Sequence, residues 1–311
     1  INIGGTIMIN KFKFLYFVIF TTVFVNMLFD KFDTFAFNQD DYIKLITTNT
    51  CQNCDLFRLD LTRKDLTASI LDNAKMTDTD LTNTDFYFSS LKKASLNISN
   101  LTGANLSGAN LSGANLSGAN LFNADFSEAD LSNANLTGAN LTGAKFFKAN
   151  LSRADLTNAN LTRAILSDAD ITRAIMTNAN LNKAIMRNTN LSGSNLIRTD
   201  LSGANLLNAN LFSADLHYAN FSGAVIHGAN FTNADLSRAT FVSSDITGAN
   251  LSNSDLYFSD FSNATLTNVT MFRSAVSKAI FFNTILTGAT LANGKVFLFG
   301  VNDNPNIEYH E

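Results

Sequence analysis

Two cysteines carry the most reactive side chains in this sequence. Cys51 and Cys54 have two residues between them in the run C-Q-N-C, a spacing found in redox motifs, zinc sites and local disulfides. A redox motif would need a βαβ setting and a zinc site would need a second pair of ligands, and the sequence supplies neither. In the five-residue register described below, both cysteines point inward. In an exported protein this position favours a disulfide that staples the first turn.

The histidines and the paired aspartates are poorly placed for catalysis or metal binding. His217 and His227 fall half a coil apart on opposite faces of the expected fold, and His310 lies near the C-terminus. Asp168 and Asp170 fall on the outer surface, where no pocket is expected to shift a pKa. We therefore predict no catalytic residues, no metal, no cofactor and no enzymatic activity.

One five-residue phrase defines the elements that position these side chains. Residues 101–121 read L-T-G-A-N-L-S-G-A-N-L-S-G-A-N-L-S-G-A-N-L, and all 48 positions spaced by five from Leu56 to Leu291 hold Leu, Ile, Val, Met or Phe. We call this position the centre. The centre and the small residue two before it lie on the same side of an extended segment and point inward. A period of five fits neither a helix nor a plain strand, so we expect four turns of about 90° to close a coil of about 20 residues.

The pattern A-[DN]-L-[ST]-x resembles that of the pentapeptide-repeat family. The resemblance covers Cys51 to about Val296 and implies a mainly β fold, a right-handed quadrilateral β-helix of about 12 coils. It implies no single activity, because the family has many unrelated roles. The opening C-x-x-C-D-L resembles the start of cyanobacterial members. Some members dimerise end to end through C-terminal coils that contain Phe.

Residues spaced by 20 should form columns along the β-helix. We interpret two inward Phe columns as core filling rather than as a ligand channel. An outward column from Asn100 to Asn220 should hydrogen-bond between coils. The Phe columns contain Phe221, Phe241, Phe261 and Phe281 in one case and Phe126 and Phe146 in the other.

Two outward columns are basic. Aspartates lie close beside both, so we interpret the columns as ordinary solvated faces rather than as binding sites for nucleic acid or anionic lipid. One column contains Lys93, Arg153, Arg173 and Arg273, and the other contains Arg58, Arg198, Arg238 and Lys278.

Residues 1–36 are typical of an export signal. Lys11 and Lys13 precede an apolar run over residues 14–29, and the small-residue site T-F-A ends at Ala36. The apolar run is shorter than the roughly 20 residues of a membrane span, and an uncleaved membrane anchor is the alternative. We expect the chain to start at Met8.

Three further segments follow the export signal. Residues 37–50 should contain a capping helix that covers the first coil. The β-helix should occupy residues 51–296, and a C-terminal tail should follow in residues 297–311.

Outward positions that become apolar are the candidate interaction sites. The last phrases lose their Asn and Asp and are followed by V-F-L-F, which indicates a surface buried by the tail or by a second copy. The family resemblance implies the second alternative, a homodimer through the C-terminal coils. The candidate residues are Ile165, Ile185, Val225, Phe272, Ile280, Phe282, Ile285, Phe297 and Phe299.

The charge balance bears on function. Residues 51–296 contain 19 acidic and 18 basic residues. This near-neutral body argues against nucleic-acid binding and against the first alternative function, a DNA mimic that inhibits a type II topoisomerase. A second alternative, an ice- or surface-binding solenoid, would use a Thr column that Phe122, Asn182 and Val242 interrupt.

We predict a non-enzymatic structural or interaction scaffold with an unknown protein partner. The export signal and the cyanobacterial resemblance point to the thylakoid lumen or the periplasm. A membrane would be involved only if the N-terminal segment stays uncleaved.

Overall fold

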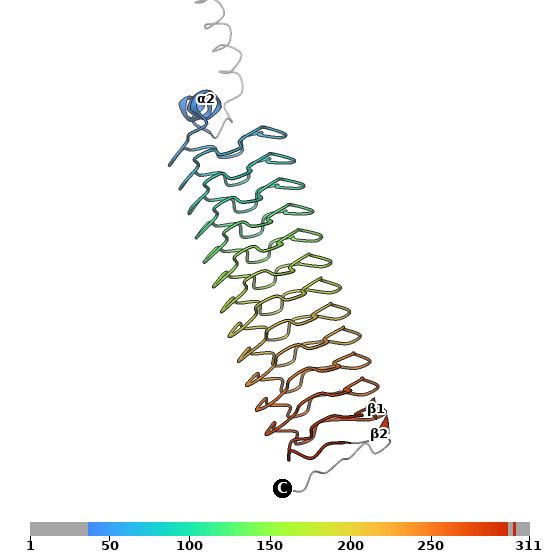
Figure 1. The fold of residues 1–311 in the computed structure, drawn as a ribbon. Coiled ribbons are helices and arrows are strands. Elements are labelled where there is room, and N and C mark those ends of the chain that lie inside the picture. Colours follow the sequence, from blue (N-terminus) through green and yellow to red (C-terminus); the bar gives the residue numbers. More distant parts are fainter. Residues whose placement is uncertain (1–36, 298–300, 303–311) are drawn as a thin grey trace, which may run out of the picture.

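A computed structural model gives the fold and describes residues 37–297 and 301–302. The described chain is a long rod of stacked coils, with one helix across its N-terminal end and a pair of two-residue strands at its C-terminal end (Figure 1). The predicted fold class, a right-handed quadrilateral β-helix with a short N-terminal helix, is confirmed. The predicted export signal, residues 1–36, lies outside the described residues.

Neighbouring coils are joined by backbone hydrogen bonds in every phrase, and one residue of each phrase forms a parallel bridge. Parallel bridges join residues 20 apart, from Thr50 and Ile70 to Thr270 and Thr290. Within this series the amide of Asn120 donates to the carbonyl of Ser99 in the preceding coil at 2.9 Å. Because the chain turns after every phrase, the ladder is built from many short pairings rather than from long strands.

Every corner of a coil needs a residue in the left-handed region. The second residue after each centre from Cys51 to Leu286 has a positive φ, for example 59° at Arg153 and 65° at Gly108. A side chain in this region costs about 1–2 kcal/mol, which Gly avoids. At Gly108 a neighbouring ring adds a second constraint, because a Cβ there would lie 2.6 Å from the Phe88 ring.

In most phrases the interior holds one large and one small side chain, and Phe replaces Leu at several centres. Phe221, Phe241, Phe261 and Phe281 stack in successive coils with ring centroids 4.7, 4.7 and 5.2 Å apart. The stack predicted from the 20-residue spacing is confirmed. Phe231 enters from the opposite side and meets the Phe221 and Phe241 rings edge-on at 5.9 and 6.3 Å.

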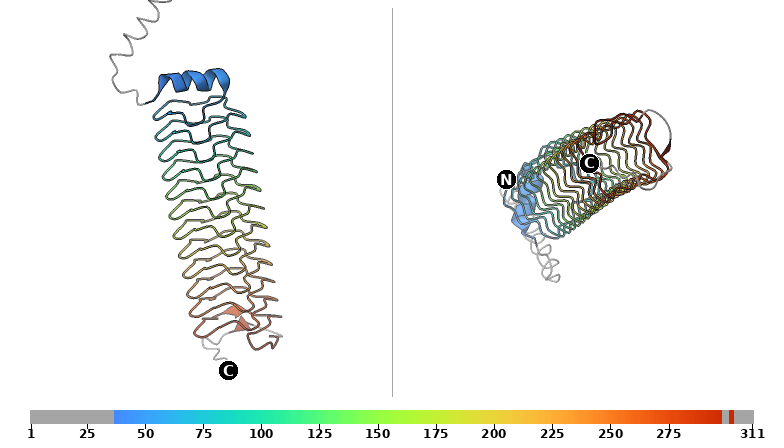
Figure 2. Two further views of the ribbon diagram at one scale, coloured as in Figure 1. Left: turned by 90° about the vertical axis from the view of Figure 1, so that its left-hand side faces the viewer. Right: turned by 90° about the horizontal axis from the view of Figure 1, so that it is seen from below.

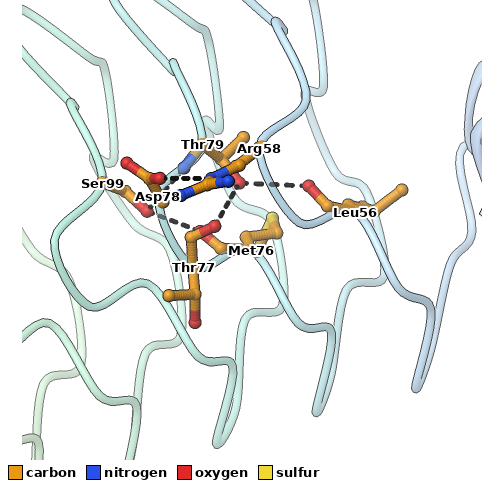
Figure 3. Close-up of polar contacts among 7 residues, drawn as sticks. All are labelled: Leu56, Arg58, Met76, Thr77, Asp78, Thr79 and Ser99. Carbon is orange, nitrogen blue, oxygen red and sulfur yellow. Dashed lines mark hydrogen bonds and ion pairs between the residues drawn. The ribbon is translucent and has the colours of Figure 1, made fainter. Parts of the chain in front are cut away.

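Where Ser or Thr replaces the inward Ala, most of the hydroxyls donate to a backbone carbonyl, whereas those of Ser69 and Ser89 have no hydrogen-bond partner. Thr79 Oγ1 donates to the carbonyl of Leu56 at 3.1 Å, and Ser99 Oγ donates to the carbonyl of Met76 (Figure 3). Each bond reaches the preceding coil. Such bonds offset the cost of burying a hydroxyl, so the narrow interior tolerates these two residue types.

Helix α2, Gln39–Thr48, closes the N-terminal end of the rod (Figure 2). Asn38 caps its N-terminus, where the Asn38 side chain accepts hydrogen bonds from the amides of Asp40 and Asp41, and Asn49 caps its C-terminus in the left-handed conformation. Leu45 is buried against the first coil and supplies the apolar contact of this cap. Among the described residues, no helix has both the length and the apolar character needed to cross a membrane.

The C-terminal end is closed by the chain turning back on itself. Strand β1, Thr284–Ile285, pairs antiparallel with β2, Val301–Asn302. Between them, the amide of Gly288 donates to the carbonyl of Phe297 at 2.7 Å. Phe297, the first residue of the expected C-terminal tail and one of the candidate interaction residues, is partly buried against the core.

Candidate interaction surface

The cysteine pair lies where α2 meets the first coil. Cys51 and Cys54 are joined in a disulfide, and both are buried. Cys51 Sγ is 3.0 Å from the carbonyl oxygen of Asp41, and the Asp41 carboxylate accepts a hydrogen bond from the amide of Asp55 at 2.8 Å. Asp41 therefore connects the cap to the first coil, a role that the sequence pattern did not indicate.

Asp41, Cys51 and Cys54 are also the one group of three potential metal ligands among the residues described. Cysteine binds a metal as a thiolate, and sulfurs joined in a disulfide are not thiolates. The arrangement therefore fits a structural staple.

Surface carboxylates with shifted pKa values owe the shifts to their immediate neighbours. Burial raises the pKa of Asp125, but hydrogen bonds from Ser127 and Lys145 outweigh this effect, so that the pKa lies below its ordinary value. The pKa of Asp60 is lowered by hydrogen bonds from the side chain and amide of Thr62. A general acid at neutral pH would need a raised pKa. These carboxylates instead hold the turns of their own phrases.

One Ser, His and Asp cluster deserves comparison with a catalytic triad. His217 Nδ1 lies 2.6 Å from Ser237 Oγ, and Ser237 Oγ donates to Asp235 Oδ1 at 2.5 Å. In a triad the histidine stands between the other two residues and takes the serine proton. Here the serine stands in the middle and gives its proton to the carboxylate, so the cluster lacks the order that activates a nucleophile.

The predicted apolar surface residues form two separate groups. In the first, Ile165 and Ile185 are joined by a parallel bridge and stack directly, and Val225 lies two coils beyond Ile185 with Asn205 between them. Ile185 and Val225 are exposed and Ile165 is half-buried. A polar residue therefore interrupts this group.

The second group surrounds the last described coil. Phe272, Ile280, Phe282 and Ile285 are all exposed, and we call them the C-terminal patch. Phe282 is the most exposed of the four, at 50%. Phe299 lies outside the described residues. Apolar side chains gathered at one end of a rod are typical of a surface that another molecule covers.

Comparison with family models gives one match. The model described as pentapeptide repeats, in eight copies, matches residues 51–86 and overlapping windows that together span residues 99–288. A comparison with curated proteins gives no match.

Solved structures give several partial likenesses. HetL, a pentapeptide repeat protein involved in heterocyst differentiation regulation from the cyanobacterium Nostoc sp. strain PCC 7120, is 29% identical, with 84% of this chain and 99% of that chain covered and a TM-score of 0.43. The plasmid-mediated fluoroquinolone resistance protein QnrB1 is 22% identical, with coverages of 62% and 86% and a TM-score of 0.26. A thylakoid lumen pentapeptide repeat protein from Arabidopsis thaliana is 30% identical, with coverages of 40% and 70% and a TM-score of 0.18. These TM-scores are too low to carry an argument about function.

Proposed function

Because this chain belongs to the pentapeptide-repeat family, we propose that it is an exported, non-enzymatic scaffold that associates with a second copy of itself through its C-terminal coils. Members of the family are generally structural or interaction proteins. The observation that supports self-association is the C-terminal patch. Phe272, Ile280, Phe282 and Ile285 are exposed on the outer surface of the last coils, where a second copy packed against these coils would bury them.

Two observations support export. Residues 1–36 have the composition and order of an export signal. Cys51 and Cys54 are paired in a disulfide, which persists in oxidising compartments and is rare in reducing ones. The compartments that fit are the thylakoid lumen and the periplasm, with an uncleaved membrane-anchored form as the alternative.

The test of self-association uses light scattering of the mature protein at micromolar concentration. We expect a mass near twice that of one chain, and we expect Phe282→Asp to give monomers because a buried charge would oppose the interface. Phe122→Asp is the matched control, since Phe122 holds the same position in its phrase, is also exposed and lies in a coil far from the end. A monomeric mass for the unsubstituted chain would contradict the proposal.

The test of export is the compartment and N-terminus of the protein in its source cells. We expect an N-terminus just after Ala36 in the lumenal or periplasmic fraction. An intact N-terminus in the membrane fraction would indicate the anchored form, and an unprocessed cytoplasmic protein would contradict export.

A further inference from the structure

A line of alternating cations and aromatic rings runs along one face of the C-terminal half of the rod. Arg198, Tyr218, Arg238, Phe258 and Lys278 are spaced by 20 and therefore occupy the same corner of five successive coils. All five side chains are exposed. We call this line the cation–aromatic ladder.

The cations of the ladder cover the faces of its rings. The Arg238 guanidinium lies over the Tyr218 ring at 5.3 Å and over the Phe258 ring at 5.6 Å from the ring centroids. Arg198 covers Tyr218 at 5.7 Å, and Lys278 covers Phe258 at 4.8 Å. Arg238 also donates a hydrogen bond to the Tyr218 hydroxyl. With the ring faces occupied, the ladder presents N–H groups and ring edges to the solvent, and both carry positive partial charge.

No ion pair neutralises the three cations of the ladder within the part of the chain that the structure describes. The same column shows the contrast near its other end, where Arg58 forms an ion pair with Asp78 one coil on, at 2.7 Å (Figure 3). In the ladder an aromatic residue takes the place of that carboxylate. A carboxylate 20 residues away can therefore neutralise a cation in this column, but the ladder has no carboxylate at these positions.

Carboxylates flank the ladder and limit its width. Asp215, Asp235 and Asp255 form a parallel column three residues before Tyr218, Arg238 and Phe258. Each of them accepts a hydrogen bond from the amide two residues on, which holds it in its own turn. The positive surface is therefore a narrow line with a negative border.

The aromatic residues occupy backbone positions that are costly for them. Tyr218 and Phe258 have φ values of 61° and 58°. Elsewhere in the rod this corner is often held by Gly or Asn, which tolerate the left-handed region better. Since both rings are on the surface, packing of the core does not explain why they are there.

We propose that the cation–aromatic ladder binds an acidic segment of a partner protein, extended along the rod axis. Cations on alternate coils are separated by about 9.6 Å, twice the ~4.8 Å spacing of paired strands. In a polyproline II segment every third side chain lies on the same face, separated by about 9.3 Å. A segment with an acidic residue at every third position would therefore place a carboxylate opposite each cation. The inference goes beyond the proposed self-association, since it concerns a different surface and a different partner.

The same geometry disfavours other polyanions. Single-stranded nucleic acid and many sugars use open aromatic faces for stacking, and here the cations cover those faces. An anionic membrane is a broad plane, which the flanking carboxylates would repel. A narrow peptide avoids both difficulties.

The experiment is a fluorescence titration of the mature protein with labelled (Glu-Pro-Pro)6 at low ionic strength. A peptide of the same composition with its glutamates in one block is the control ligand. We expect the periodic peptide to bind more tightly, and we expect the triple variant Arg198→Gln, Arg238→Gln, Lys278→Gln to lose roughly tenfold in affinity, as three exposed charge pairs would. The matched variant, Lys93→Gln, Arg153→Gln, Arg173→Gln, removes the same charge from a neighbouring column and should lose less than about twofold.

Three outcomes of this titration would overturn the proposal. Equal losses in the two triple variants would mean that binding follows total charge alone. Ladder-dependent binding of heparin, single-stranded DNA or anionic phospholipid vesicles, without binding of the peptide, would assign a different partner. Absence of any peptide binding would remove the site. None of these results bears on the dimer mass, so the two proposals fail separately.

A second variant separates binding from structure. Tyr218→Asn with Phe258→Asn keeps all three charges and places a residue that tolerates positive φ at both corners. We expect weaker peptide binding with unchanged or higher thermal stability. Lower stability with unchanged binding would show that the rings serve the fold, and would overturn the proposal.

Discussion

At the scale of single residues, most polar side chains on the rod are bound within their own phrase or to the next coil. The outward Asn column is an example, since Asn140 Nδ2 donates to Asn120 Oδ1 at 2.9 Å and Asn220 Nδ2 donates to Asp200 Oδ1 at 3.1 Å. The Thr hydroxyls of the neighbouring column are used in the same way, as when Thr142 Oγ1 donates to Asn140 Oδ1 at 2.8 Å. Hydroxyls committed in this way are poorly available to order water, which weighs against an ice-binding face.

The pair His227 and Asp245 gives a prediction about pH. Burial raises the pKa of Asp245, but hydrogen bonds from Thr247 and the close contact with His227, whose Nε2 lies 2.7 Å from Asp245 Oδ2, lower it below its ordinary value. The carboxylate therefore stabilises the fold above its unfolded pKa, and this contribution is lost as the pH falls through the lower folded pKa. Since both side chains are partly exposed, we expect a contribution below about 1 kcal/mol.

Carboxyl chemical shifts followed by NMR during a pH titration measure this effect. His227→Ala should raise the pKa of Asp245, because the variant lacks one of the groups that lower this pKa against the effect of burial. His217→Ala, on another face, should leave it unchanged. An unchanged Asp245 pKa in His227→Ala would show that Thr247 alone accounts for the shift.

Two glycines separate the cost of the left-handed corner from the cost of a steric contact. Gly108 and Gly138 have φ values of 65° and 66°, but a Cβ at Gly108 would meet the Phe88 ring at 2.6 Å, while a Cβ at Gly138 would have nothing within 4 Å. Both Ala variants should lose about 1–2 kcal/mol of unfolding free energy. Gly108→Ala should lose more than Gly138→Ala because of the Phe88 contact. The difference should be below about 1 kcal/mol, since the exposed Phe88 ring can rotate away. Chemical denaturation measures both values, and a far larger loss at Gly108 would show that the ring is fixed.

At the scale of elements, the two ends of the rod are closed in different ways. Helix α2 covers the first coil through Leu45 and the Asp41 contacts, whereas the last coil is closed by the antiparallel return of the chain through Phe297 and β2. Both devices cover the open backbone of a terminal coil, which would otherwise be free to pair with another molecule.

Loss of the Leu45 side chain should therefore loosen one end only. Leu45 is buried, and Leu45→Ala should cost about 2–5 kcal/mol of local stability in the cap. Hydrogen exchange should rise in α2 and the first coil while the middle of the rod stays protected, because each coil contacts only its neighbours. Ile43→Ala, at an exposed position of the same helix, is the control. Faster exchange along the whole rod in Leu45→Ala would contradict a local role.

At the scale of the whole molecule, the five-residue period was enough to predict the architecture, the inward Phe stack and the columns of residues spaced by 20, such as Ile165 and Ile185. These features depend on the parallel register of the coils, which the repeat of the phrase every five residues determines along the rod. The Asp41 contact with Asp55 and the return of the chain through Phe297 could not be predicted, because they join segments that share no period. The three cations of the cation–aromatic ladder were identified from the sequence as part of a basic column. The cation–π contacts were not, because they depend on Tyr218 and Phe258, which lie between the cations and carry no charge.

The same register makes the length of the rod adjustable in steps of one coil. Deleting residues 101–120 joins Asn100 to Leu121, so every centre, corner and column continues unbroken. Since stability in such a stack is a sum of coil and neighbour terms, we expect a folded rod shorter by about 4.8 Å with a small drop in melting temperature. Deleting residues 101–118 instead keeps two extra residues between Asn100 and Leu121. These two residues must bulge out of the backbone hydrogen-bond pattern between coils, and amides of that corner then have no partner. X-ray scattering and thermal unfolding compare the two, and the larger deletion should be the more stable. The opposite order would mean that the rod is held by composition rather than by register.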